Sequence, residues 1–341
     1  GGVDSAVTAY LLKQQWHDIT AGFMINYMAP EGEVCPTKED MAVAKQVAEY
    51  LEIPFFTFDY RDEYEDKVLQ YMYEWYQKGI TPNPDIMCNS EVKFKVFLDE
   101  ALEAGFDMVA TWHYARISTD TSWISHLLKW LDNNKDQSYF LAGLSQFQLS
   151  KWLFPIGHLE KPRVREIARE AGLPNAERKD SQWICFVGKV NMSDFLEKKI
   201  NPKPGKVLDT SWNILWDHKG VFYYTIWQRK GLDIWGQAEP IFIVRKNIEA
   251  NEIIVWTKKD LALYNDMLFV KTWNYLSNQN IKFPLKAKTK IRYRQADQGC
   301  LISETDWGYE VKFDQDQRAI AAGQICAIYL DDELIMSGII Q

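Results

Sequence analysis

The residues best suited to chemistry are two cysteines far apart in the chain, Cys88 and Cys185. Cys88 follows Asp85 by three residues, in a loop that two prolines stiffen and that precedes an expected helix at 90–104. A cysteine near a helix N-terminus is stabilised as the thiolate, the form that acts as a nucleophile. A nearby carboxyl group can then serve as general acid or base. A proline-rich turn with a buried cysteine is the alternative interpretation of these residues.

Cys185 follows a polar turn and lies among apolar neighbours in the segment 179–188. Free cysteine is often fully buried, so this residue alone indicates a core position. Cys35, Cys300 and Cys326 lie in strand-like or loop segments without polar partners, and we interpret them as structural. Five irregularly spaced cysteines do not predict a disulfide framework. Without a CxxC pair or a Cys/His cluster, we expect no zinc site and no metal held by the protein alone.

The chain opens on a glycine turn, residues 1–6, that runs into a helix-like pattern. Such a turn presents unpaired N–H groups and a partial positive charge, which suit a phosphate. It is not a Walker loop, because no Gly-Lys-Ser/Thr follows. An ordinary glycine-rich turn that caps a helix is the alternative. A phosphate loop needs a strand upstream to aim it, so we expect the natural chain to extend beyond Gly1.

Alternating strand-like and helix-like segments in the first half predict an α/β fold with a parallel sheet. Ligands of such sheets bind at the carboxyl ends of the strands. The loop at 1–5, Met24–Asn26 and Thr111–His113 all follow or lie at such ends, so we expect them to meet in one crevice. Strands are expected at 18–25, 55–59 and 107–111, and helices after Thr37 and at 63–78, 90–104, 136–148 and 161–171.

The pattern changes after a proline-rich linker at 201–205 to short β segments, which are typical of a small barrel or sandwich. We therefore expect an N-terminal catalytic domain (1–200), a small β-rich central domain (201–260) and a C-terminal β-barrel (261–341). The expected strands lie at 221–226, 240–245, 252–256, 286–294, 309–313, 325–330 and 333–340.

The 341 residues carry a net charge of −8, which argues against a generic nucleic-acid coat but allows a local basic patch. No segment approaches the ~20 apolar residues of a membrane span, and the cysteine usage favours a reducing cytoplasm. Tryptophan is abundant, with 14 residues. Several fall where turns are expected: Trp16, Trp112, Trp130, Trp183, Trp227 and Trp235.

Together these segments resemble the tRNA-specific 2-thiouridylases, enzymes that place sulfur on the wobble uridine of certain tRNAs. The opening loop is similar to the Ser-Gly-Gly-x-Asp-Ser pyrophosphate loop of the ATP pyrophosphatases, without its leading serine. The resemblance follows the whole chain in order. It is carried by residues 1–6, 22–26, 81–89, 111–116, 135–140, 154–157, 179–188, 224–229, 292–295 and 323–324.

The resemblance implies that ATP and Mg²⁺ activate the O2 oxygen of a flipped-out uridine by adenylation. It implies that Cys185 carries a persulfide, delivered by a sulfur-relay protein or cysteine desulfurase. The persulfide sulfur then attacks carbon 2 directly or is released as sulfide by Cys88, which forms a transient disulfide with Cys185. Asp85 is the implied acid or base. The implied nucleotide-binding residues are Gly1, Gly2, Val3, Asp4, Ser5, Ala6, Met24 and Trp112.

Contacts with the anticodon stem-loop of tRNA are implied at several separate segments. The basic and aromatic residues of 286–295 suit phosphate contact and stacking, although a solvated strand face is the plain alternative. His113 alone would more often be a packed histidine. The implied tRNA-binding residues are Asn83, Pro84, Asp85, His113, Lys135, Asp136, Gln137, Arg292, Tyr293 and Gln324.

The chain departs from the family pattern at Trp112, Trp130, Trp183 and Trp227, where the family has glycine. Glycine allows positive φ or a close approach of a ligand, which tryptophan does not provide cheaply. Trp112 can stack on adenine or fill the space that adenosine needs. Two alternatives therefore stay open: a catalytically impaired tRNA-binding homologue with a blocked pocket, or another ATP pyrophosphatase-type ligase that needs no paired cysteines.

Overall fold

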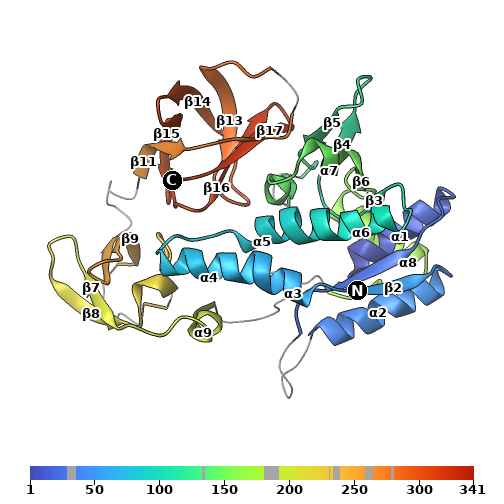
Figure 1. Ribbon diagram of the computed structural model, residues 1–341, viewed down its shortest axis with the longest axis horizontal. Helices are drawn as coiled ribbons and strands as arrows, with labels where there is room; N and C mark the ends of the chain where they lie inside the picture. The colour runs from blue at the N-terminus through green and yellow to red at the C-terminus, as the bar shows by residue number, and fades with distance from the viewer. Residues whose placement is uncertain are drawn as a thin grey trace.

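Short parallel strands with helices around them form the N-terminal region of the computed structural model (Figure 1). The structure describes residues 1–28, 36–132, 135–179, 192–229, 231–232, 239–257, 264–277 and 280–341. Strand β1 pairs in parallel with β2, as the alternating pattern predicted. Strand β3 also pairs in parallel, with β6, a strand that the sequence analysis did not expect. The elements are α1 (Val3–Gln14), β1 (Ala21–Ile25), α2 (Pro36–Tyr50), β2 (Phe55–Asp59), β3 (Val109–Ala110), α7 (Gln146–Ser150), β6 (Trp152–Leu153) and α8 (Lys161–Glu170).

Helix α1 packs against α8 through apolar residues at helical spacing. Val3 and Val7 of α1 share a buried cluster with Val164 and Ile167 of α8. Burial of these side chains fixes the start of α1 beside α8, which matters because the glycine loop lies there.

Two long helical segments run side by side through the middle of the molecule (Figure 1). Each contains a π-helical stretch, a rare form that is frequent at functional sites. The second segment begins at Asn83, whose side chain accepts a hydrogen bond from the Ile86 N–H at 3.3 Å. The segments are α3 (Arg61–Tyr64), η1 (Glu65–Leu69) and α4 (Gln70–Gln77), then α5 (Pro84–Met87), η2 (Cys88–Val96) and α6 (Phe97–Glu103).

A four-stranded sheet with the order β8-β7-β10-β9 forms the central region, after the short helix α9 (Met192–Glu197). The strand expected at 221–226 is wrong: the 3-10 turn η4 (Val221–Tyr223) and irregular chain lie there. Side chains take the backbone N–H groups instead of a sheet ladder, since Asn251 accepts from Val221 and Gln228 accepts from Thr225. The strands are β7 (Gly205–Leu208), β8 (Ile214–His218), β9 (Ile241–Asn247) and β10 (Glu252–Thr257).

The C-terminal sheet extends into the N-terminal region. A hairpin that the sequence analysis missed, β4 (Arg116–Thr119) and β5 (Ser125–Leu128), joins the last strand through the pair Leu128–Glu333. The order is β11-β15-β14-β13-β16-β17-β5-β4, with β12 on β17. Its other strands are β11 (Tyr264–Val270), β12 (Asn274–Tyr275), β13 (Leu285–Lys290), β14 (Gln298–Thr305), β15 (Gly308–Arg318), β16 (Ile325–Leu330) and β17 (Glu333–Ile339).

Two further expectations need correction. The helix expected at 136–148 is the 3-10 turn η3 (Ser138–Leu141) followed by α7, because Ser145 forms a capping box that starts a new helix. The strand expected at 286–294 ends at Lys290, where Gln295 accepts a hydrogen bond from the Ile291 N–H and the chain turns.

Four tryptophans have left-handed backbone conformations, but only two of them, Trp16 and Trp227, were expected at turns. The four are Trp16, Trp123, Trp212 and Trp227, with φ between 62° and 74°. The expected Trp112 and Trp130 do not have a positive φ, and Trp183 and Trp235 lie outside the described residues. A positive φ of this kind costs a side chain with a Cβ roughly 1–2 kcal/mol. Trp16 and Trp123 are 94% and 85% exposed, so packing does not offset that cost there.

Among the helices of the described residues, none has the length and apolar character that a membrane crossing needs.

Candidate active site

The glycine loop forms the N-terminus of α1, as predicted. Gly2 is the N-cap residue in extended conformation, and the helix begins at Val3. The first N–H groups of a helix have no intrahelical partner, and the helix dipole places partial positive charge there. Apart from the neighbouring residues in the chain, no described atom lies within 4 Å of the position that a Cβ on Gly2 would take. The loop therefore offers donors beside open space, which suits phosphate oxygens.

Asp4 fixes this loop to the rest of the site. Its carboxylate accepts hydrogen bonds from the Tyr114 hydroxyl at 2.9 Å and from the Lys161 ammonium at 2.6 and 2.7 Å. The side chains of Lys161 and Asp4 are only 14% and 20% exposed, so water weakens this ion pair less than a surface pair. Tyr114 follows Thr111–His113, so the structure brings two of the three predicted strand-end segments together.

Asn175 supports the loop from behind and was missed by the sequence analysis. Its side-chain amide donates to the carbonyl oxygens of Gly1 and Gly2, each at 3.1 Å. Arg178 also donates to the Gly1 carbonyl at 3.0 Å and pairs with Asp40 at 2.9 Å. Asn175 and Arg178 lie more than a hundred positions from the loop, so no local pattern could have indicated their contacts with it.

Cys88 lies at the start of the π-helical stretch, one turn into the helix that begins after Asn83. It is 1% exposed and belongs to the buried cluster that contains Met24, the predicted nucleotide-binding residue at the end of β1. Asp85 precedes it by three residues on the same helix, a spacing that places both side chains on one face. Cys185, together with Trp183 and Cys35, lies outside the described residues, so the pairing of Cys88 with Cys185 stays a prediction.

Asn26 is a second residue that the sequence analysis did not assign. It follows β1 on the same face as Met24 and is 1% exposed. Neither atom of its amide has a hydrogen-bond partner among the described residues. A buried amide needs hydrogen-bond partners, because leaving it without them costs about 1–3 kcal/mol.

Trp112 and His113 differ sharply in their surroundings. Trp112 is 39% exposed, whereas His113 is buried at 7% beside the rings of Phe94 and Phe154. Its Nδ1 lies 2.8 Å from the Thr111 hydroxyl. Burial, and then the nearby Lys93 charge, lower the pKa of His113 well below its ordinary value. A neutral packed histidine was the alternative interpretation, and the geometry matches it.

The loop before Cys88 is held by the C-terminal barrel. The Gln324 amide donates to the carbonyls of Thr81 and Pro82 at 2.9 and 3.2 Å and accepts from Asn83 at 3.4 Å. The Thr81 hydroxyl also meets Thr225 of the central region at 3.3 Å. Two residues predicted to bind tRNA, Asn83 and Gln324, are thus in contact although they lie 241 positions apart.

The residues of 135–137 and 292–293, also predicted to bind tRNA, lie near the junction of η3 and the barrel. The Tyr293 ring lies 4.4 Å from that of Phe140, and Arg292 donates to the Arg318 carbonyl at 2.8 Å. Gln137 accepts from the Tyr114 N–H at 2.8 Å and is half-buried, as is Lys135. Asp136, in contrast, is buried at 3%.

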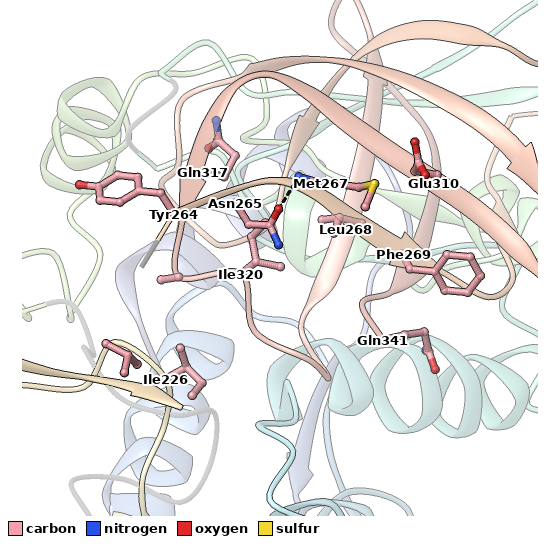
Figure 2. Close-up of a pocket in the computed structure, with 12 residues that line it drawn as sticks. Ile226, Tyr264, Asn265, Met267, Leu268, Phe269, Glu310, Gln317, Ile320 and Gln341 are labelled. Atoms are coloured by element: carbon pink, nitrogen blue, oxygen red, sulfur yellow. Dashed lines mark hydrogen bonds between the residues drawn. The ribbon is translucent and has the colours of Figure 1, made fainter. Parts of the chain in front are cut away.

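A separate cleft of about 400 Å³ lies between the central sheet and the edge strand β11 (Figure 2). Ile226 and Val244 line its central side, and Tyr264, Met267 and Gln317 line its barrel side. None of the residues predicted to bind nucleotide or to act in catalysis lines it.

Within the described ranges, no three His, Cys, Asp or Glu side chains gather in a geometry that could hold a metal ion.

Comparison with known proteins assigns the whole length of the chain. Family profiles match residues 1–189 (tRNA methyl transferase HUP domain), 193–257 (tRNA methyl transferase PRC-barrel domain) and 265–340 (Aminomethyltransferase beta-barrel domain). A tRNA-specific 2-thiouridylase MnmA of Hydrogenovibrio crunogenus is 44% identical over 347 residues, covering 100% of this chain and 91% of the relative. Proteins of the same name from Streptococcus mutans and Shouchella clausii are each 43% identical, covering 100% of this chain and 93% and 94% of theirs.

Proposed function

This chain belongs to the tRNA-specific 2-thiouridylase family, and we propose on that basis that it replaces the O2 oxygen of the wobble uridine of tRNA with sulfur in a reaction driven by ATP. Two contacts far apart in the sequence support the proposal. Asp4 bonds Tyr114 beside Trp112, while Met24 packs in the buried cluster that holds Cys88. In this proposal the nucleotide on the loop and the Cys88 thiol act on the same uridine.

In the first step, the uridine O2 attacks the α-phosphorus of ATP, the bond to the β-phosphate oxygen breaks, and pyrophosphate leaves. The N–H groups at the start of α1 stabilise the negative charge that develops on the phosphate oxygens. Mg²⁺, when carried on the ATP phosphates, offsets more of that charge. The uridine must leave the base stack, because its O2 is otherwise out of reach.

In the second step, a persulfide sulfur displaces AMP from carbon 2 of the uracil ring. If the terminal sulfur of the Cys185 persulfide attacks directly, Cys88 then attacks the Cys185 sulfur, which forms a Cys88–Cys185 disulfide and frees the thiocarbonyl product. If Cys88 acts first, it forms the same disulfide and releases sulfide, which attacks carbon 2. An external thiol reduces the disulfide in both routes. In this proposal Asp85, one turn before Cys88, takes or gives the proton of the reacting thiol.

The sulfur comes from a relay protein or cysteine desulfurase, because neither ATP nor tRNA supplies it. A cytoplasmic setting fits this chemistry, since the disulfide must be reduced between turnovers. We also propose the domain limits 1–200, 201–260 and 261–341. The other two functions considered from the sequence are less well supported, since the relatives named as 2-thiouridylases match this chain over its full length.

The test measures the two steps separately. The protein is incubated with ATP, Mg²⁺, unmodified tRNA, and a cysteine desulfurase with cysteine. The released pyrophosphate is measured, and the tRNA nucleosides are analysed by mass for 2-thiouridine. The wild type is expected to yield both products. A protein that binds tRNA but releases no pyrophosphate would be the impaired homologue, and the proposed function would be wrong.

Cysteine variants test which thiols take part in the sulfur transfer. Cys88→Ser and Cys185→Ser are expected to lower 2-thiouridine formation at least about a thousandfold while tRNA-dependent pyrophosphate release continues. Cys300→Ser is the matched control, because burial raises the pKa of that barrel thiol to about 12 and leaves it unreactive. If both site variants kept full thiolation, a ligase that needs no paired thiols would be the better assignment.

A further inference from the structure

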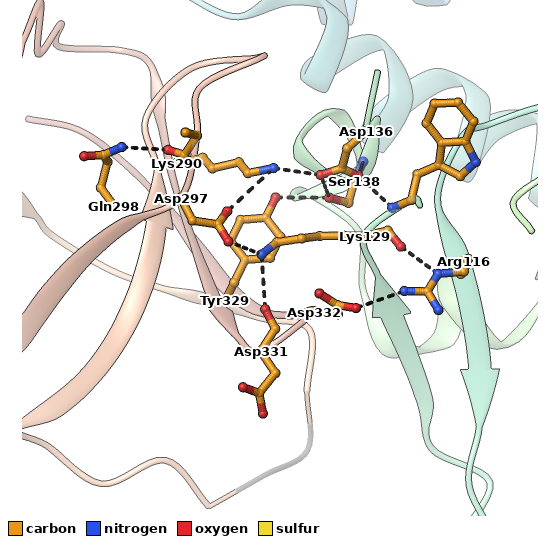
Figure 3. Close-up of polar contacts among 12 residues, drawn as sticks. Arg116, Lys129, Asp136, Ser138, Lys290, Asp297, Gln298, Tyr329, Asp331 and Asp332 are labelled. Atoms are coloured by element: carbon orange, nitrogen blue, oxygen red, sulfur yellow. Dashed lines mark hydrogen bonds and ion pairs between the residues drawn. The ribbon is translucent and has the colours of Figure 1, made fainter. Parts of the chain in front are cut away.

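Three buried charged side chains and a fourth that is 25% exposed, Asp297, form a group where the N-terminal region meets the C-terminal barrel (Figure 3). Lys290 at the end of β13 pairs with Asp136 at 2.9 Å, and Lys129 after β5 pairs with Asp297 at 2.6 Å. The side chains of Lys129, Lys290 and Asp136 are 3%, 4% and 1% exposed. Lys290 also lies 3.8 Å from Asp297, so the two pairs form one neutral group.

Every described contact of the Asp136 carboxylate lies within the protein. One oxygen accepts hydrogen bonds from the N–H groups of Trp130 and Ser138, each at 3.1 Å. The other accepts from the Ser138 hydroxyl at 3.0 Å and from Lys290. Tyr329 completes the group, because its hydroxyl meets Ser138 at 3.1 Å and its ring lies under the Lys290 ammonium at 5.3 Å. A carboxylate in this position does not reach an RNA strand at the surface.

The Asp136–Lys290 pair also lies beside two segments that are predicted to bind tRNA. Asp136 is the middle residue of 135–137, and Lys290 comes two residues before 292–293. Both segments are predicted to bind tRNA, but they belong to regions far apart in the chain. We propose that the Asp136–Lys290 pair is a positioning contact that holds these two segments in register as one tRNA-binding face, and that Asp136 does not itself touch RNA.

The physical argument rests on the cost of a broken pair. Two charges taken out of water are stable only while they remain paired, and removal of one partner leaves the other buried without compensation. The nearest relief for an uncompensated Lys290 is a shift of the β13 end toward Asp297 or toward water. That shift moves residues 292–293 relative to 135–137, and a bound tRNA would then find only one segment in place.

The inference rests on the proposed function but is tested by binding, so the two can fail separately. The dissociation constant for unmodified tRNA and the KM for ATP are measured for the wild type, Asp136→Asn, Lys290→Met and the double variant. Each single variant is expected to weaken tRNA binding about tenfold, and the double variant by clearly less than the product of the two. The KM for ATP should stay within about twofold, because the phosphate loop is supported elsewhere. Lys312→Met, on an exposed part of the same sheet, is the matched control and should bind normally.

The Lys290 result decides between positioning and direct contact. If Lys290→Met binds tRNA as the wild type does, or if the two single effects multiply, the proposal is wrong. Thermal unfolding of each variant shows whether it is folded. Should Asp136→Asn fail to fold, Lys290→Arg is compared with Lys290→Met instead: retained binding in the first and loss in the second supports the pair. Equal loss in both overturns it. Absence of 2-thiouridine from wild-type reactions would reject the proposed function and leave these binding results intact.

Discussion

The two loops at the proposed reaction centre are held in place in different ways. The described contacts of the phosphate loop come from the N-terminal region, where Tyr114 and Lys161 hold Asp4 and Asn175 holds the glycine carbonyls. The loop before Cys88 is held across regions, since Gln324 comes from the barrel and Thr225 from the irregular chain of the central region. The nucleotide side can thus keep its geometry when the barrel moves, whereas the thiol and uridine side cannot.

This difference fits the two substrates. ATP is small and needs one rigid loop, while tRNA is large and must meet several regions at once. Close packing at the junction makes the coupling tight: Gly323, next to Gln324, has φ of 89°, and a Cβ there would lie 2.3 Å from Ile80. A movement of the barrel should therefore also move the loop at 81–83 and change its contact with tRNA.

Asp4→Asn gives the largest expected effect and tests the phosphate-loop half of the comparison. Loss of the carboxylate charge leaves Lys161 poorly compensated in a partly buried position, at a cost of about 2 kcal/mol. We expect the KM for ATP in pyrophosphate release to rise roughly thirtyfold, with little change in tRNA affinity. Glu166→Gln is the control, because its ion pair with Arg163 is about half exposed and such pairs contribute little. An equal loss of tRNA affinity in Asp4→Asn would contradict the separation of the two loops.

Gln324→Ala tests the loop before Cys88 and should affect the binding of tRNA and not that of ATP. Three hydrogen bonds to the loop at 81–83 are lost, and the carbonyls of Thr81 and Pro82 lose a donor. We expect the KM for tRNA to rise about tenfold, near 1.4 kcal/mol, with the KM for ATP unchanged. Gln315→Ala, an exposed glutamine of β15, should behave as the wild type. A rise in the KM for ATP alone would reverse the comparison.

The comparison also explains what the sequence could predict. The glycine loop and the Asp85–Cys88 segment are contiguous, so local patterns and the family resemblance identified them. The parallel strands β1, β2 and β3 were predicted for the same reason. Asn175 was missed because the glycine carbonyls that it bonds lie more than a hundred positions away. The two short strands of the β4–β5 hairpin pair locally, but the residues whose contact joins the hairpin to the barrel, Leu128 and Glu333, lie more than 200 positions apart in the chain.

The other differences depend on contacts of individual side chains that a sequence pattern does not show. The segment 221–226 alternates like a strand, but Asn251 and Gln228 take its N–H groups. Asp136 was predicted to bind tRNA from the family resemblance, and only the fold shows that it is buried against Lys290. Asn26 ends one of the predicted strand-end segments, and only the structure shows that its amide is buried with no hydrogen-bond partner in the part of the chain that is described.

Trp16→Gly should stabilise the helix that presents the phosphate loop, by about 1 kcal/mol. Trp16 ends α1 with φ of 63°, and the His17 N–H bonds the Leu12 carbonyl at 3.2 Å, as at helix ends that favour glycine. The free energy of unfolding is measured with urea. Trp307→Gly is the control, since Trp307 is 83% exposed without a positive φ and should gain nothing. Equal stabilisation by both would show that exposure, and not backbone strain, sets the effect.

His126 gives the smallest expected effect and tests whether the barrel junction depends on pH. Its ring lies 2.8 Å from Glu333 of β17 and 3.4 Å from Asp120. The hydrogen bond with Glu333 raises the pKa of His126 and outweighs the partial burial, which lowers it. A raised folded-state pKa means that this stabilisation is fully present below the unfolded value of about 6.5 and is lost as pH rises through the folded value. The wild type should therefore exceed His126→Gln in unfolding free energy by at most about 1 kcal/mol near pH 6, and by less at pH 9. His158→Gln, an exposed histidine of the N-terminal region, is expected to show no such difference. An advantage that grows with pH would mean that the neutral imidazole makes the contact, and that the hairpin joins the barrel by packing alone.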